Sequence, residues 1–317
     1  MPQNRLVIGV DSGEVQTNIA VLTTDGDLVG RASSIGSTVH LRGFDGATEA
    51  LNDLVTGIVD NPDVAHASVC TSGLHSDTET ALFRQRLRRF EWARHGLNIE
   101  AQVLAVLRSA TRNPNAVAVS CGMGSTAIAT NDRGEKWSFA SMGRPSGDWG
   151  GGIELGLAAL WHAARELDRR GPKTALTEEI SYEYDMPVTD VIAALHDGEM
   201  LEVDLGRMAP AVFYAADHGD RIARQLVERQ ASEVVAYVRA CADALRLKGG
   251  VDVVLSGSVL ASRNPSLIRQ VEEGIGGVLP EARIIFSSRE ALVGAALLAL
   301  EGVGAGPEVI ARAMRAF

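Results

Sequence analysis

The sequence predicts an α/β protein built from two similarly folded domains that face each other across a cleft. Two observations indicate this class. A pattern of three strands followed by alternating helix and strand starts near residue 5 and starts again near residue 115, so the unit βββαβα occurs twice. The length of 317 residues also suggests two domains, since one domain typically takes ~150 residues.

The first repeat begins with three short apolar runs that turn signals separate, which is typical of a β-meander. An amphipathic helix follows, because leucine, valine and isoleucine recur on one helical face. The elements predicted for this repeat are strands at 5–10, 17–22 and 28–32, a helix at 47–59, a strand at 64–70, a helix at 77–95 and a strand at 101–107.

The second repeat has the same opening and then a long helical insertion. Its predicted strands are 115–121, a segment ending at 130, 137–140, 251–255 and 282–286, and its predicted helices are 153–169, 175–184, 188–195, 205–216, 220–247, 265–275 and 290–300. We therefore expect an N-terminal domain at 1–120 and a C-terminal domain at 121–302, with residues 303–317 as a tail that crosses back to the first domain.

Composition excludes several classes of protein. The formal net charge of −10 gives a polyanion no overall attraction, so we expect no nucleic-acid partner. No run approaches ~20 apolar residues and the N-terminus has no leader pattern, so we expect no membrane segment. Cys70, Cys121 and Cys241 have neither disulfide-framework nor zinc spacing, which favours a cytoplasmic location.

Three glycine-containing turns each follow a predicted strand, at 11–13, 122–126 and 256–258. Glycine and serine at strand ends let backbone N–H groups approach a phosphate. The alternative is a tight turn, and for any one of the three alone that alternative is favoured. Residues 122–127 nearly match GxGxxG but lead into a strand, so they do not indicate a Rossmann fold.

Asp11 lies where a carboxylate can hold Mg²⁺ through water beside a nucleotide, with an Asx-turn as the alternative. Residues 143–152 place Asp148 and Trp149 among five glycines just before a helix. This stretch predicts a ligand-binding loop, with a flexible linker as the alternative.

The stretches at 7–17, 117–126, 143–176 and 251–260 (VIGVDSGEVQT, VAVSCGMGST, the block that contains GDWGGG, and VDVVLSGSVL) resemble the actinobacterial N-acetylglucosamine kinase family. This family belongs with the BadF/BadG/BcrA/BcrD-type ATPases, in the larger group of sugar kinases, Hsc70 and actin. The resemblance implies two ribonuclease-H-like (actin-like ATPase) domains, with ATP and Mg²⁺ in the cleft and an amino sugar beside the γ-phosphate. It also implies cleft closure and a homodimer.

At the first phosphate loop, the resemblance carries over to Asp11, Gly13 and Thr17, with Asp11 as the residue that holds Mg²⁺ through water. Glu14 departs from the family pattern, as do Ser12, Val15 and Gln16. A Glu14 carboxylate about 5 Å from a phosphate would cost on the order of 3 kcal/mol at an effective dielectric of ~20, so ATP binding is expected to be weakened.

The position of the family's catalytic base matches Gln102, and the asparagine before it is replaced by Ala101. An amide cannot take the proton of a sugar hydroxyl, and loss of a positioned base typically costs ~10²- to 10⁴-fold in rate. Phosphoryl transfer is therefore predicted to be weak or absent, as in a pseudokinase.

The other motifs transfer better. The second phosphate loop keeps Gly122, Gly124 and Ser125, and Gly257 lies in the adenosine motif. For the sugar, the resemblance implies contacts from Asp148, Trp149, Ser72, Gly73 and His40.

Two functions remain open. One is a degenerate kinase homologue that binds a sugar-like ligand, and the other is an active ATP-dependent kinase in which another acid, Asp148, acts as base.

Overall fold

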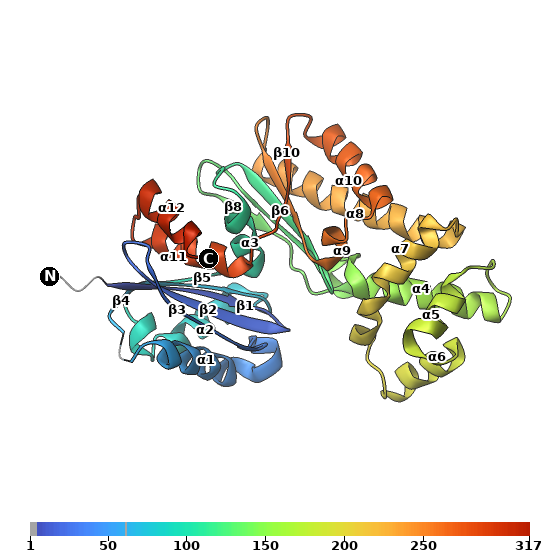
Figure 1. Cartoon of the computed structure of the whole chain (residues 1–317), viewed down its shortest axis with the longest axis horizontal. Coiled ribbons are helices and arrows are strands. Elements are labelled where there is room, and N and C mark those ends of the chain that lie inside the picture. Colours follow the sequence, from blue (N-terminus) through green and yellow to red (C-terminus); the bar gives the residue numbers. More distant parts are fainter. Residues whose placement is uncertain (1–4, 61) are drawn as a thin grey trace. The chain divides into compact units, whose positions relative to one another are not determined.

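The structure is a computed structural model that describes residues 5–60 and 62–317. These residues form two compact units, which are residues up to Arg112 together with Ser287–Phe317, and Asn113–Phe286. Within the described residues, each unit contains one five-stranded mixed sheet with helices packed against it (Figure 1). The chain thus has the predicted α/β fold with two domains. The cleft expected between the domains stays a prediction.

The sheet of the first unit has the strand order β3-β2-β1-β4-β5. Its first three strands form an antiparallel meander, and β4 and β5 continue the sheet in parallel with β1. The central strands β1 and β4 are buried along almost their whole length, as expected when helices cover both faces of a sheet. The strands are β1 (Leu6–Ser12), β2 (Gln16–Thr23), β3 (Leu28–Ile35), β4 (Val64–Thr71) and β5 (Leu97–Ala101).

Helices cover both faces of this sheet (Figure 1). Along β1, Ile8 points into the core beneath α1, whereas Val7 points into the core beneath α11. Gly9 allows α11 to lie against the strand, since a Cβ there would be 2.4 Å from the backbone nitrogen of Ala296. The helices are α1 (Val39–Ile58), α2 (Asp77–Leu87), η1 (Glu91–Ala93), α3 (Gln102–Ala110), α11 (Ala291–Gly302) and α12 (Pro307–Arg315).

The sheet of the second unit has the order β10-β9-β6-β7-β8. Again the first three strands of the repeat form an antiparallel meander, and the fourth and fifth are parallel to the first on its other side. The two sheets therefore have the same topology, which confirms the duplicated βββαβα pattern. The strands are β6 (Ala116–Cys121), β7 (Ser125–Thr130), β8 (Lys136–Ser138), β9 (Asp252–Ser256) and β10 (Arg283–Phe286).

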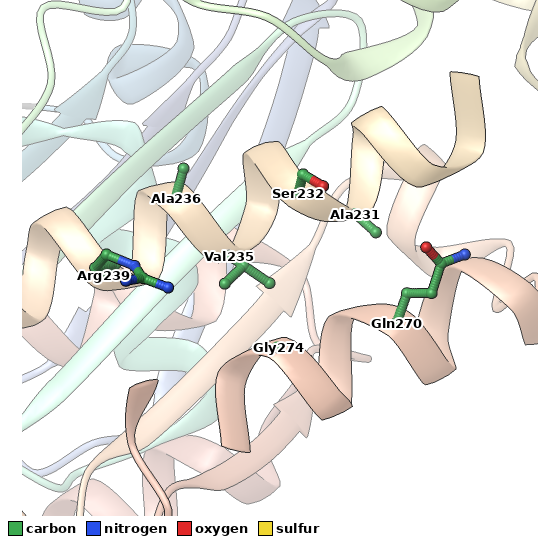
Figure 2. Close-up of a pocket in the computed structure, with 7 residues that line it drawn as sticks. All are labelled: Ala231, Ser232, Val235, Ala236, Arg239, Gln270 and Gly274. Atoms are coloured by element: carbon green, nitrogen blue, oxygen red, sulfur yellow. The ribbon is translucent and has the colours of Figure 1, made fainter. Parts of the chain in front are cut away.

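The 25-residue helix α8 packs on β6, β7 and β8, and α10 lies along its other side. Gly274 permits this approach, because a Cβ there would be 2.4 Å from Cγ2 of Val235 (Figure 2). The helices of this unit are η2 (Arg144–Ser146), α4 (Gly151–Leu167), α5 (Leu176–Tyr184), α6 (Val188–Asp197), η3 (Glu202–Met208), α7 (Ala209–Asp217), α8 (Arg221–Leu245), α9 (Ser258–Ala261) and α10 (Pro265–Val278).

Two sequence predictions of secondary structure were wrong. The strand predicted at 101–107 is the N-terminal part of α3, since a short buried apolar run does not distinguish a strand from a helix. The helix predicted at 77–95 ends at Leu87, and the chain then turns so that Trp92 enters the core.

The division of the chain also differs from the expected one. Residue 120 lies inside β6, and the division falls after Arg112 instead. The part of the chain that returns to the first unit starts at Ser287, so it includes α11 as well as the tail.

Cys70, Cys121 and Cys241 are all buried and free of disulfides. No helix among the described residues combines the length and the apolar character needed to cross a membrane.

Candidate active site

Asp11 lies near the end of β1, with only 7% of its surface exposed. Burial raises the pKa of its carboxyl, because the charged form is desolvated, while side-chain hydrogen bonds from Gln102 and Asn18 act in the opposite direction. Nearby Glu290 adds a smaller upward contribution to the same pKa. This carboxylate is thus an acid in a poorly hydrated setting.

Gln102 is the first residue of α3, directly after β5. Its Nε2 donates a hydrogen bond of 2.7 Å to Oδ1 of Asp11. An ionised carboxylate only accepts hydrogen bonds, so this contact fixes which end of the amide faces Asp11 and leaves Oε1 as the outward acceptor. Gly13 makes room for the amide, since a Cβ there would be 2.9 Å from Nε2. Gln102 can therefore accept a hydrogen bond from a ligand, but it cannot take a proton.

The turn between β1 and β2 exposes both Glu14 and Val15 to solvent. Thr17, by contrast, is fully buried. Its Oγ1 accepts hydrogen bonds from the backbone nitrogen of Ser37 at 3.1 Å and from Ser37 Oγ at 3.0 Å, and it lies 3.2 Å from Ser12 Oγ. The Thr17 hydroxyl thus joins the β1–β2 turn to the segment before α1.

Three of the residues expected to contact the sugar lie together. Ser72 donates its backbone N–H to the carbonyl of Ser12 at 3.0 Å, and a Cβ at Gly73 would be 3.4 Å from that of His40. Ser72 Oγ and Thr38 Oγ1 are buried and make no hydrogen bond within the described part of the protein. Buried hydroxyls are normally paired, so this corner of the unit has unused hydrogen-bonding capacity.

Asp11 also lines a cavity of about 510 Å³. Asn18 and Gln16 from β2, Arg31 from β3 and Glu290 before α11 lie around it. Arg31 and Glu290 form an ion pair at this wall. A volume of this size is typical of small-molecule sites.

In the second unit, the turn at residues 122–125 joins the end of β6 to the first residue of β7. Gly122 and Gly124 face open space, since a Cβ at either position would meet nothing within 4 Å. The turn is closed by a bond of 2.9 Å from the Gly122 nitrogen to the Gly124 carbonyl. Because packing does not require either glycine, the space in front of this turn is available to a ligand.

The glycines before α4 have a packing role. Gly151 has φ +80°, and a Cβ there would be 2.6 Å from the Gly124 carbonyl oxygen. The first three N–H groups of α4 are bonded within the protein: Gly151 donates to Gln230 Oε1, Gly152 to the Gly122 carbonyl and Ile153 to the Met123 carbonyl. The N–H groups at this helix N-terminus are therefore already hydrogen-bonded within the protein. Residues 150–152 are closely packed and do not form a flexible linker.

Asp148 is half-buried and accepts hydrogen bonds on both carboxylate oxygens. Oδ2 accepts from the Gly143 nitrogen at 3.0 Å and from Ser146 Oγ at 2.7 Å, and Oδ1 accepts from the Tyr237 hydroxyl at 3.3 Å. Asp148 also lines a cavity of about 320 Å³, together with Ser125. Ser125 Oγ donates to the Trp149 carbonyl at 3.1 Å, which links the phosphate-loop candidate to residues 148–149.

Trp149 does not line that cavity. Its side chain is 8% exposed and belongs to the hydrophobic core, with the Arg229 guanidinium 4.1 Å from the ring centroid. In the sequence, the indole stands beside an acid and several glycines, which suggests a ligand contact. In the structure the ring is buried against α8, where burial of its large apolar surface stabilises the fold.

Gly257 also has a packing role. It has φ +88°, and a Cβ there would be 2.3 Å from the Cys121 carbonyl carbon. The turn after β9 thus lies directly against the start of the 122–125 turn. Ser256 Oγ in this turn is buried and makes no hydrogen bond within the described residues.

Sequence reasoning missed Tyr237, Gln230 and Asn18. Gln230 is fully buried, and Tyr237 is 6% exposed. The signal was present, since the two polar groups lie seven residues apart on the apolar face of a long helix.

Among the described residues, no three histidine, cysteine, aspartate or glutamate side chains gather as a metal site. Mg²⁺ bound to a nucleotide usually needs only one or two protein carboxylates, with phosphates and waters as the other ligands. Asp11, a desolvated acid that lines a cavity, fits that limited role.

The comparisons with known proteins agree with this fold. The BadF/BadG/BcrA/BcrD ATPase family matches residues 8–299. The chain is 24% identical to the N-acetyl-D-glucosamine kinase of Dictyostelium discoideum, over 93% of this chain and 98% of that one. It is 19% identical to an N-acetylmuramic acid/N-acetylglucosamine kinase of Clostridium acetobutylicum, again over 93% and 98%.

Two solved structures illustrate the likeness of fold. A Chromobacterium violaceum protein assigned as an N-acetylglucosamine kinase has a TM-score of 0.73 at 23% identity, over 94% of this chain and 99% of that one. A ROK family glucokinase from Streptomyces griseus, solved with glucose and AMPPNP, has a TM-score of 0.58 at 16% identity, over 93% and 99%.

Proposed function

Because the chain belongs to the BadF/BadG/BcrA/BcrD ATPase family, we propose that it binds an amino-sugar-like ligand together with ATP and transfers phosphate slowly or not at all. The single observation that carries this proposal is the contact between Gln102 and Asp11. An amide stands where the family resemblance expects a base, and that amide is held in place by the neighbouring acid.

The sugar side of the proposal rests on acceptors and hydroxyls. Asp148 has four lone-pair positions and three internal donors, so about one position stays open for a sugar hydroxyl. Ser72, Gly73 and His40 lie together beside two unpaired buried hydroxyls. Polar groups of this kind suit a polyhydroxylated ligand, and the similar relatives named above act on amino sugars.

The nucleotide side rests on the open turn at 122–125 and on Asp11. We propose that the backbone of Gly122 and Gly124 approaches the phosphates, since no packing demand explains these glycines. Asp11 would hold Mg²⁺ through water, and the ion would neutralise phosphate charge when bound. Exposure of Glu14 lets its carboxylate point into solvent, which reduces the repulsion expected from the sequence.

The chemistry expected of these residues is binding without efficient proton removal. Oε1 of Gln102 can accept a hydrogen bond from the reacting hydroxyl and orient it. Phosphoryl transfer depends chiefly on positioning and charge neutralisation, so loss of the base slows transfer without forbidding it.

An alternative is an active kinase in which Asp148 acts as the base. One observation favours it: Asp148 lines a cavity and keeps an open acceptor position. In that case Asp148→Asn would abolish turnover, and Gln102→Asp would not raise it.

Two measurements test the proposal. Thermal shift and calorimetry are run with N-acetylglucosamine, glucosamine and muramic acid derivatives, each with and without ATP–Mg²⁺, and ADP release is followed in parallel. We expect stabilisation by at least one amino sugar and slow ADP release. Absence of binding by every amino sugar would contradict the binding claim, and rapid ADP release that Asp148→Asn abolishes would establish the alternative.

A further inference from the structure

Helix α8 presents three side chains to residues 148–151, and none of them was identified from the sequence. Arg229 lies over the Trp149 ring, Gln230 accepts from the Gly151 nitrogen at 3.0 Å, and Tyr237 donates to Asp148. Gln230 and Tyr237 are seven residues apart and so lie two turns apart on one face. The loop that contains Asp148 is thus held from α8 at several points.

Of these three side chains, Tyr237 is the one that contacts the carboxylate of Asp148, the residue proposed to bind the sugar. Its hydroxyl lies 3.3 Å from Asp148 Oδ1 and 3.5 Å from Ser125 Oγ. Burial raises the pKa of Tyr237, so its hydroxyl keeps its proton at neutral pH and acts as the donor to the carboxylate. Ser125 Oγ could also accept the Tyr237 proton, but the Asp148 carboxylate is nearer and is the stronger acceptor, so the proton is directed to Asp148.

The ring of Tyr237 has little freedom to move. It packs edge-to-face against Phe139, with centroids 4.7 Å apart and planes at 87°, and Phe139 packs in the same way against Trp137 at 4.6 Å. On the other side of α8, α10 lies close at Gly274 (Figure 2). The hydroxyl is therefore presented from a rigid element.

The hydrogen bonds of Asp148 show what this contact does. Oδ2 is held by Gly143 and Ser146, both in the same short loop as Asp148 itself. Among the hydrogen bonds of the described residues, Tyr237 is the donor to Asp148 that comes from outside that loop. Without it, residues 149–151 stay anchored to α8, but the Asp148 carboxylate loses its direct link to that helix, and its bonds to Gly143 and Ser146 are no longer held in one position.

We propose that Tyr237 is a positioning residue that fixes Asp148 relative to the sheet and so sets the affinity for the sugar. This inference rests on the proposed function for its ligand, but the contact between Tyr237 and Asp148 can be tested without one. Tyr237 does not line the cavity beside Asp148, so we expect its effect on sugar binding to pass through Asp148, its nearer hydrogen-bond partner.

The first test uses the ligand-free protein. Tyr237→Phe removes only the hydroxyl and keeps the aromatic packing. Amide hydrogen exchange at Gly143, which donates to Asp148, is expected to accelerate about tenfold, the factor for a lost charged hydrogen bond of roughly 1.5 kcal/mol. Unchanged exchange at Gly143 would overturn the proposal.

Tyr184→Phe is the matched control. Tyr184 is another buried tyrosine, 7% exposed, whose hydroxyl donates to the Asp204 carbonyl at 2.9 Å. Loss of the Tyr184 hydroxyl is expected to lower the free energy of unfolding by about as much as Tyr237→Phe does, while hydrogen exchange at Gly143 stays unchanged. Equal acceleration in both variants would mean general loosening and would contradict a positioning role.

The second test measures sugar binding by calorimetry in a double-mutant cycle. Tyr237→Phe is expected to weaken N-acetylglucosamine binding about tenfold, and to have no further effect once Asp148→Ala is present. In turnover assays the KM for sugar would rise while the KM for ATP changes less than about twofold. If the two substitutions weaken sugar binding additively, the inference is wrong. If the wild type binds no sugar, the proposed function is wrong, and the exchange test alone decides whether Tyr237 positions Asp148.

Discussion

At the scale of single residues, the pairing of Gln102 with Asp11 has an energetic consequence. Asp11 is buried and two amide side chains hydrogen-bond it, yet desolvation still dominates and raises its pKa. A carboxyl whose pKa is higher in the folded than in the unfolded state favours folding most when it is protonated. Its contribution to stability is therefore fully present below the unfolded pKa and is lost as the pH rises through the folded value.

We therefore predict that Asp11→Asn raises the Tm of the ligand-free protein at pH 7 by about 2–4 °C, the shift expected for roughly 1 kcal/mol in a domain of this size. The neutral amide keeps an acceptor for Gln102 and avoids the cost of burying a charge. The difference from the wild type should shrink as the pH falls and Asp11 gains its proton, which its raised pKa makes easier than for an exposed aspartate. Thermal denaturation at pH 7 and at a series of lower pH values checks this, with exposed Glu14→Gln as the control. A lower Tm for Asp11→Asn at pH 7 would show that its charge is stabilised after all.

Thr17 illustrates a different role from the one that its motif suggests. The resemblance places it among nucleotide-binding residues, but its hydroxyl is buried and bonded to Ser37. We predict that Thr17→Val destabilises the protein by roughly 1–3 kcal/mol, because the Ser37 N–H loses its acceptor. Thr17→Ser, which keeps the hydroxyl, should lose less. Urea unfolding with an unchanged m-value checks this, and equal losses in the two variants would count against the hydrogen bond as the cause.

At the scale of elements, the glycines of the second unit separate into two kinds. Gly124 faces open space, whereas Gly151 combines a positive φ with contact against the Gly124 carbonyl. We predict that Gly124→Ala leaves the free energy of unfolding within about 1 kcal/mol but weakens ATP–Mg²⁺ binding. Gly151→Ala should cost about 2–4 kcal/mol through backbone strain and overlap. Paired denaturation and nucleotide calorimetry check this, and a large loss of stability in Gly124→Ala would refute the open-turn description.

Most helices and strands could be predicted from the sequence, and the exceptions share a physical reason. Period-two and helical patterns located most strands and helices, because each buries a distinct face, but β5, α9 and α12 were not predicted. They failed at α3, where a run of buried residues follows β5 directly, and at α2, where the apolar spacing continued past the end of the helix at Leu87. Neither boundary has a local signal strong enough to override the tertiary packing that sets it.

At the scale of the whole molecule, the duplication was visible in the sequence because it repeats an order of elements, and the two sheets share that order. The boundary was less visible. It requires knowing that β6 pairs with β7 and β9, and that α11 packs on β1, contacts that join distant parts of the chain. Site residues at strand ends could be predicted from turn chemistry. Tyr237 and Gln230 lie on a helix, and the tertiary fold decides which face of that helix points toward residues 148–151. The homodimer implied by the resemblance stays a prediction.

The rate at which this protein transfers phosphate with an amide at the base position distinguishes a weakened kinase from an ordinary one. The direct measurement is kcat for ADP release with saturating ATP–Mg²⁺ and the best-bound amino sugar, in the wild type and in Gln102→Asp. We predict slow wild-type turnover and an increase of about 10²-fold or more in Gln102→Asp, as expected when a positioned base is restored. Rapid wild-type turnover that Gln102→Asp fails to increase would contradict the claim that Gln102 limits the reaction.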